Sequence, residues 1–243
     1  MEPDAYKNMA SVEARHWWFR GRRAVLAAMI RSLNLQPGAK ILELGSGTGG
    51  NLAMLSAFGR VTAVEMNPVA RELAQAKRSS AEIRGGHLPD GLDLTERYNL
   101  VCLFDVLEHI DDDRATLATI RRLLAPGGWA IITVPAYAAL FGPHDVAMHH
   151  KRRYERAELS AKLRQAGLRV QKLSFMNTAL LPAALVARVM ERAFRRPQAS
   201  GTSVPLVPLN AVFTTLFATE AYLLPYMSLP CGLSLLAVVT EAE

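Results

Sequence analysis

The feature that most constrains the fold is a regular alternation of apolar runs and helical stretches between Lys40 and Thr133. The runs KILELG, RVTAVE and NLVCLFD are short and rich in aliphatic residues, and a stretch with helical periodicity follows each of them. NLVCLFD is apolar almost throughout, as expected for a central parallel strand that is covered on both faces. Strands that alternate with helices in this way predict a parallel, doubly wound α/β sheet.

The alternation is looser beyond Pro135. A long loop with three histidines comes first, and an apolar, alanine- and leucine-rich region follows further on. The last residues, LSLLAVVTE, have the composition of a strand. For this half we expect helices at 156–166, 177–196 and 209–227, a strand at 168–175, a linker at 196–208 and a closing strand.

Composition restricts the partners and the compartment. The chain has 28 basic and 22 acidic residues, a net charge of +6, which suits nucleic acid, an anionic membrane surface, an acidic substrate or a plain solvated basic face. Cys102 and Cys231 have no metal-type spacing, and the start of the chain has no apolar core typical of a signal peptide. We therefore expect the cytoplasm, with the inner face of the membrane as the alternative location.

A glycine-rich segment carries the chemistry. Gly45, Gly47 and Gly49 follow the first apolar run, and glycines there let the backbone turn tightly and approach a ligand. Glu65 ends the next run and is expected beside this loop. A carboxylate suits a ribose diol because each hydroxyl can donate a hydrogen bond to one oxygen.

The same loop also fits the nicotinamide-dinucleotide pattern G-x-G-x-x-G, through Gly45, Gly47 and Gly50. Glu43 argues against that cofactor, because an acid two residues before the loop would repel a pyrophosphate. The acid would instead attract the sulfonium and ammonium groups of S-adenosylmethionine (SAM). An NAD(P)-dependent oxidoreductase is kept as the alternative.

At this point the chain resembles the class I SAM-dependent methyltransferases of the small-molecule type. ELGSGTGG looks like their first motif, FDVLEHI like the motif after their fourth strand, and LLAPGGWAIITVP like their helix–turn–strand signature. The resemblance implies SAM as the cofactor and a Rossmann-like fold. That fold is a doubly wound, mostly parallel seven-stranded sheet with a reversed last strand, here with a helical insertion before it.

The resemblance also implies roles for the cofactor residues. Glu65 matches the acid at the end of the second strand, Met66 the residue that packs on adenine, and Asp105 lines the methionine end. His87 stands where the family has an acid beside the adenine. The residues predicted to bind SAM are thus Glu43, Gly45, Gly47, Glu65, Met66, His87 and Asp105.

We treat the chain as one methyltransferase domain, 1–243, with four parts. Residues 1–36 form N-terminal lid helices, in which the resemblance places Trp17, Trp18 or Arg22 near the ligand. Residues 37–175 form the SAM-binding core, 176–231 an apolar helical insertion and 232–243 the last strand.

Histidines near the carboxyl ends of the strands are the candidates for acceptor chemistry. An oxygen nucleophile needs a base within hydrogen-bond reach. We predict His109 and His150 as catalytic residues and Arg153 as the residue that positions the acceptor, although His109 could instead help to start a helix. His144, Asp145, His149 and His150 match no strong zinc template, so we predict no metal site.

The expected function is SAM-dependent methyl transfer to a small-molecule or lipid-linked acceptor at oxygen. The insertion at 177–230 is apolar and flanked by basic residues, which suits a membrane surface, a substrate cap or a homodimer face. A non-catalytic, membrane-associated binding protein with this fold is a further alternative. FDVLEH stands where a base-flipping element would be, which argues against nucleic acid.

Overall fold

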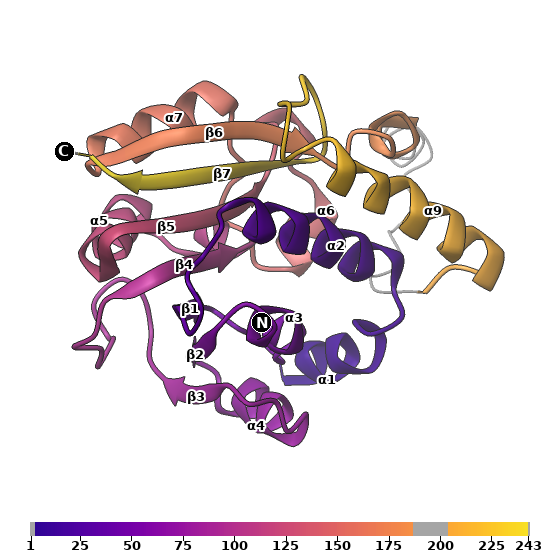
Figure 1. Ribbon diagram of the computed structural model, residues 1–243. Coiled ribbons are helices and arrows are strands. Elements are labelled where there is room, and N and C mark those ends of the chain that lie inside the picture. Colours follow the sequence, from indigo (N-terminus) through magenta and orange to yellow (C-terminus); the bar gives the residue numbers. More distant parts are fainter. Residues whose placement is uncertain (1–2, 187–203, 243) are drawn as a thin grey trace.

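The computed structural model describes residues 3–186 and 204–242 (Figure 1). Much of the helix expected at 177–196 lies outside these residues, and so do most of the linker expected at 196–208 and the basic residues Arg192, Arg195 and Arg196.

One sheet organises the described residues. Its seven strands have the order β3-β2-β1-β4-β5-β7-β6, and all neighbours are parallel except that β7 runs antiparallel to β5 and β6. The predicted doubly wound sheet with a reversed last strand is therefore confirmed. The strands are β1 (Lys40–Leu44), β2 (Arg60–Glu65), β3 (Glu82–Gly85), β4 (Tyr98–Phe104), β5 (Leu124–Pro135), β6 (Leu168–Met176) and β7 (Ser234–Glu241).

Helices cover both faces of this sheet (Figure 1). Their bounds are α1 (Pro3–Val12), α2 (Trp17–Ser32), α3 (Leu52–Ser56), α4 (Pro68–Ala76), α5 (Asp113–Leu123), α6 (Pro143–Ala147), α7 (Arg156–Gln165) and α9 (Val207–Thr219), with short 3₁₀ turns η1 (Leu107–His109), η2 (Ala138–Leu140) and η3 (Glu220–Tyr222).

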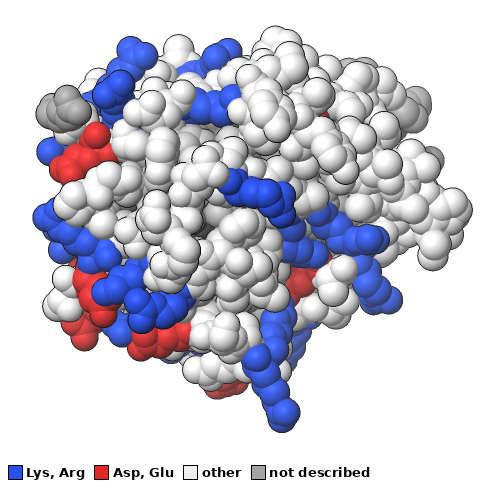
Figure 2. All heavy atoms as spheres, in the orientation of Figure 1, with Lys and Arg blue, Asp and Glu red and all other residues white. Residues whose placement is uncertain are grey.

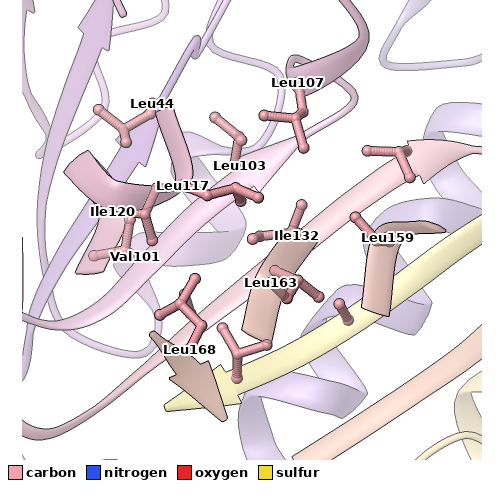
Figure 3. Close-up of a cluster of buried hydrophobic side chains, with 14 of the residues drawn as sticks. Leu44, Val101, Leu103, Leu107, Leu117, Ile120, Ile132, Leu159, Leu163 and Leu168 are labelled. Carbon is pink, nitrogen blue, oxygen red and sulfur yellow. The ribbon is translucent and has the colours of Figure 1, made fainter. Parts of the chain in front are cut away.

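The core lies on both sides of the central strands. Val101 and Leu103 of β4 face α5 and α7, where they meet the buried cluster shown in Figure 3. Leu100 and Cys102 alternate with them and face α2 and α9 on the other side. Because both faces of β4 are buried, its continuous apolar sequence is explained, and Cys102 is the buried hydrophobe expected from it.

Local signals set the helix ends. Asn67 accepts a hydrogen bond from Ala70 N at 3.1 Å to start α4 with Pro68 in its first turn, and Asp112 accepts from Ala115 N at 2.9 Å to start α5. The helix after the first apolar run begins only at Leu52, because the glycine loop lies between the strand and the helix.

Two further expectations differ from the structure. The helix expected at 209–227 ends at Thr219 and continues as the turn η3. The long loop after β5 contains η2 and α6, since Pro143 stands in the first turn of α6 and Asp145 accepts a hydrogen bond from Gly142 N at 2.9 Å. Within 3–186 and 204–242, no helix combines the length and apolar character that crossing a membrane requires.

Candidate functional site

A cavity of about 910 Å³ opens at the carboxyl ends of β1, β2, β4 and β5. Its walls come from the glycine loop, the segment after β3, η1 and the α6 region, and the N-terminal helices α1 and α2 cover it. Ligands of open α/β sheets bind outside the carboxyl ends of the strands, and ligand pockets commonly have about 300–1,000 Å³. The cavity is therefore the candidate ligand site.

The glycine loop and Glu65 meet in this cavity as the sequence predicts. Gly47 has a φ of +53°, nothing lies within 4 Å of the place where a side chain would start, and its N–H donates to Glu65 Oε2 at 2.8 Å. The second oxygen, Oε1, accepts from Asn67 N at 2.9 Å. Two backbone donors thus fix the carboxylate, which keeps lone pairs free for a ligand.

The surroundings of position 45 and its backbone conformation both require a glycine there. Its φ is +72°, and a Cβ at this position would lie 2.6 Å from a methyl carbon of Val106. A side chain here would be both strained and overpacked.

Glu43 lies behind the loop and does not line the cavity. Its Oε1 accepts a hydrogen bond from Asn51 Nδ2 at 2.7 Å, and Asn51 does line the cavity. Burial raises the pKa of Glu43 to about 7. Its negative charge can therefore act on a ligand only through Asn51 and across the loop.

Met66 and His87 also line the cavity. The Met66 side chain is 68% exposed, which leaves its thioether open to pack against a flat ligand group. His87 pairs with Gly91 through two backbone hydrogen bonds and packs over it, since a Cβ on Gly91 would lie 2.2 Å from the ring.

Asp105 is held by the lid helix α2. Its carboxylate accepts a hydrogen bond from Arg22 Nη1, and the Arg22 guanidinium lies 4.3 Å from the centre of the Trp18 ring. Arg22 is buried, and among the described residues its Nε has no partner. A buried, unpaired guanidinium N–H beside a cavity is suited to a ligand carboxylate.

The first helix is fastened to the glycine loop. Glu13 accepts a hydrogen bond from Thr48 Oγ1 at 2.8 Å and pairs with Lys77, while its backbone carbonyl accepts from Arg23 at 2.9 Å. Tyr6 of α1 lines the cavity, and burial together with the nearby Glu65 carboxylate raises its pKa to about 12. Tyr6 and Glu13 thus bring the N-terminal segment against the glycine loop and the cavity.

Asp145 joins two of the predicted acceptor residues. Its Oδ1 lies 2.9 Å from His150 Nδ1 and accepts from Arg153 Nε at 2.8 Å. Burial alone would raise the pKa of Asp145, but these hydrogen bonds outweigh it and hold the pKa well below its usual range. An ionised carboxylate at this place can accept a proton carried on Nδ1, which corresponds to the histidine tautomer with its lone pair on Nε2.

Glu108 and His109 stand next to this pair. Glu108 is fully buried and lines the cavity, and neither of its carboxylate oxygens has a hydrogen-bond partner among the described residues. Its Oε1 lies 4.0 Å from Nε2 of His150. Burial and Asp105 hold the pKa of Glu108 well above its usual range. The Nδ1 of His109 lies 3.3 Å from the His149 carbonyl oxygen. Burial and His150 lower the pKa of His109 to about 4, which keeps its ring neutral at physiological pH.

Three of these side chains could also hold a metal ion. Glu108, His109 and His150 each offer a ligand atom, and these atoms lie within 4.8 Å of one another. This trio differs from the histidine-loop set considered from the sequence.

The other basic residues of the histidine loop are paired with acids. Arg152 lies 3.1 Å from Asp113, and Lys151 pairs with Asp111. Their charges are therefore partly neutralised. Lys151 and Arg153 both line the cavity, and Arg153 does so while bound to Asp145.

Sequence reasoning did not select Asp145 or Glu108 as site residues. Glu108 lies inside the FDVLEHI motif, and its position directly before a candidate histidine was the available signal. Asp145 had a weaker signal, because only the fold shows that it lies under His150 and Arg153.

The groups in the cavity fit SAM. A fixed carboxylate suits a ribose diol, the open backbone at Gly47 allows close approach, and the unpaired Nε of Arg22 suits a carboxylate. With the strand order of the sheet, these features define a class I SAM-dependent methyltransferase.

Comparison with known proteins agrees. The model of a family described as a methyltransferase domain matches residues 17–173. The chain therefore belongs to this family, its cofactor is SAM, and the nicotinamide alternative is set aside.

Curated relatives include ubiquinone biosynthesis O-methyltransferases. That of Xanthomonas axonopodis is 29% identical over 165 residues, 60% of this chain and 69% of the relative. The mitochondrial enzyme of Schizosaccharomyces pombe is 28% identical over 115 residues, 44% of this chain and 42% of the relative. The chain thus spans less than half the length of the second relative.

Solved structures share the fold at low identity. A methyltransferase from Bacillus halodurans has a TM-score of 0.62 at 15% identity, covering 90% of this chain and 99% of that one. A glycopeptide N-methyltransferase in complex with SAM has a TM-score of 0.57 at 15% identity, covering 90% and 93%.

Proposed function

We propose that this chain transfers the methyl group of SAM to a hydroxyl oxygen of a small-molecule or lipid-linked acceptor. The observation that carries the proposal is the hydrogen bond between Asp145 and His150, which leaves the Nε2 lone pair of a cavity-lining histidine available as a base. Several curated relatives are named as O-methyltransferases, which supports oxygen as the methylated atom.

The cofactor residues predicted from the sequence receive these roles in the proposal. Glu65 binds the ribose diol, Gly45 and Gly47 allow the backbone to approach the cofactor, and Met66 and His87 flank the adenine. Asp105 and Arg22 bind the amino-acid end, the first its ammonium and the second its carboxylate. Glu43 acts from behind the loop through Asn51.

When bound, SAM supplies a methyl group on a positively charged sulfur that an oxygen nucleophile can displace in line. The protein's contribution is then alignment and proton removal. His150 accepts the hydroxyl proton of the acceptor at Nε2, and Asp145 holds the ring and stabilises the imidazolium that forms. His109, neutral and with its ring centre 4.7 Å from that of His150, orients the acceptor hydroxyl.

Arg153, which Asp145 also binds, positions the acceptor. Its Nε is bound to Asp145 and its Nη1 donates to Ala136 O at 3.2 Å, so the guanidinium is fixed in the wall of the cavity. Because the positive charge of Arg153 is already paired with Asp145, we assign Arg153 to one polar group of the acceptor rather than to a highly charged one.

The test is transfer of labelled methyl from SAM to hydroxylated aromatic acceptors, with and without an isoprenoid chain. His150→Gln should lower kcat by roughly 10²–10⁴-fold. The matched control is His149→Gln, because His149 is exposed and contacts His109 through its backbone carbonyl. Product methylated at nitrogen or carbon would contradict the proposal, and so would full activity of His150→Gln.

Treatment with a chelator distinguishes the role of His150 as a base from a role as a metal ligand. Activity that survives exhaustive chelation supports His150 as the base. Activity that is lost and restored by a divalent cation would instead assign Glu108, His109 and His150 as metal ligands. Cofactor binding without turnover on any acceptor would favour the non-catalytic binding protein.

A further inference from the structure

The helix α9 and the turn η3 present an apolar surface without charge. We call this the α9 surface, and Val207 and Tyr226 are among its most exposed side chains, at 83% and 88%. Its exposed large side chains are Leu206, Val207, Leu209, Val212, Leu216, Tyr222, Leu223, Tyr226 and Met227.

The segment that forms this surface contains almost no charged residues. Between Val204 and Leu233 the sequence has one acidic residue, Glu220, and no Lys, Arg or His. Glu220 is buried, and its carboxylate accepts backbone N–H groups of Asn177 at 2.7 Å and Thr178 at 2.6 Å. An exposed apolar patch of this extent marks an interaction site, because water solvates it poorly.

Arginines border the α9 surface. Figure 2 shows the region over α9 as white and Lys and Arg side chains in blue beside it. Arg15 lies just before α2, the helix against which α9 packs, and Arg20 lies in its first turns. Both are exposed, and in 3–186 and 204–242 no acid lies within ion-pair distance of them.

The packing of α2 on α9 fixes this arrangement. Gly21 lies against the Phe217 ring, and the Asn210 side chain accepts from Trp17 N at 2.9 Å and donates to Arg15 O at 2.9 Å. The apolar surface and the arginines therefore move as one unit.

We propose that the α9 surface docks on an anionic lipid bilayer, with its aliphatic and tyrosine side chains in the interface and the bordering arginines on lipid phosphates. Apolar side chains, exposed tyrosines and a basic border are the composition that favours an anionic membrane surface. A second copy of the chain fits less well, because a symmetric pair would bring two arginine borders together in a protein of net charge +6.

Docking would place the cavity mouth at the membrane. Trp17, whose N–H is bound by Asn210 of α9, lines the cavity, and so does Ala184. Membrane docking does not depend on the identity of the acceptor, but it would bring a lipid-linked acceptor beside His150.

The experiment is flotation of the purified full-length chain with two kinds of vesicle, phosphatidylcholine alone and phosphatidylcholine mixed with phosphatidylglycerol, without cofactor or acceptor. The chain should float with the mixed vesicles only, and high salt should release it. Arg20→Gln should weaken binding about fivefold, and the double variant with Arg15→Gln roughly 25-fold.

A matched pair of variants tests the apolar part. Val207→Glu should abolish flotation, whereas Val146→Glu, a valine 63% exposed on α6, should float as wild type. Both sites are exposed, so neither change should unfold the protein, which a thermal melt checks.

Several results would overturn docking. One is failure of the wild-type chain to float with either kind of vesicle, and another is equal flotation of Val207→Glu. A third is a dimer in light scattering that Val207→Glu turns into a monomer, which would assign the surface to a second copy. None of these results depends on methyl transfer.

Discussion

The Oδ1 atom of Asp145 lies 2.9 Å from Nδ1 of His150, and the buried carboxylate that makes this contact also holds Arg153. One acid thus contacts both a histidine and an arginine in the wall of the same cavity. Such an arrangement prepares Nε2 of His150 to accept a proton.

Asp145→Asn should lower kcat by roughly 10²–10⁴-fold, because an amide neither fixes the Nδ1 proton as firmly nor stabilises an imidazolium. Binding of S-adenosylhomocysteine should stay unchanged, since Asp145 is not among the cofactor residues. Steady-state kinetics and calorimetry measure the two effects. A parallel loss of kcat and cofactor affinity would instead point to local unfolding.

Arg22→Lys should weaken binding of S-adenosylhomocysteine by about 10–100-fold, the loss expected for a charge-assisted hydrogen bond. Lysine keeps the charge but lacks the Nε–H that faces the cavity without a partner in the described residues. Methylthioadenosine, which has no carboxylate, is the control ligand, and its affinity should not change. An equal loss for both ligands would contradict the role given to Arg22.

Glu43→Gln should stabilise the ligand-free protein at neutral and alkaline pH. Burial raises the folded-state pKa of Glu43 from 4.5 to about 7, so its contribution to stability is complete below pH 4.5 and is lost as the pH rises through 7. Glutamine does not ionise and can still accept from Asn51. Denaturant unfolding should show a gain of roughly 2–4 kcal/mol at about pH 8 and little below about pH 4.5; an equal gain at both would contradict the burial argument.

Gly21→Ala should destabilise the fold although alanine favours helices by about 1 kcal/mol. A Cβ at Gly21 would lie 2.6 Å from Phe217 Cδ1, and overpacking of this kind costs about 1–3 kcal/mol. Thermal melts of Gly21→Ala, Phe217→Leu and the double variant should show less loss in the double variant than the sum of the two. Additive losses would mean that the two side chains do not meet.

The sheet could be predicted from the sequence because its signals are local. Apolar runs such as 99–105 and capping residues such as Asn67 and Asp112 act within a few positions. The glycine loop and Glu65 were predictable for a related reason, since adjacent parallel strands end at the same edge.

The remaining part of the candidate site could not be predicted, because it depends on contacts between residues that are distant in the sequence. Asp145 is near His150 in sequence, but the position of His150 beside the η1 residues Glu108 and His109 comes only from folding. The same holds for Glu43, which lies behind the loop on Asn51 and outside the cavity lining. A sequence pattern gives the strand on which a side chain stands, and packing decides which cavity it reaches.

The most direct test of the account is calorimetric titration of wild-type protein and Glu65→Ala with S-adenosylhomocysteine. We predict micromolar binding to the wild type and a loss of about 1.5–3 kcal/mol in the variant, because the carboxylate that Gly47 and Asn67 hold in place would bind the ribose diol. Equal affinity of the two proteins would contradict the placement of the cofactor, and no binding to the wild type would contradict a competent SAM site in this cavity.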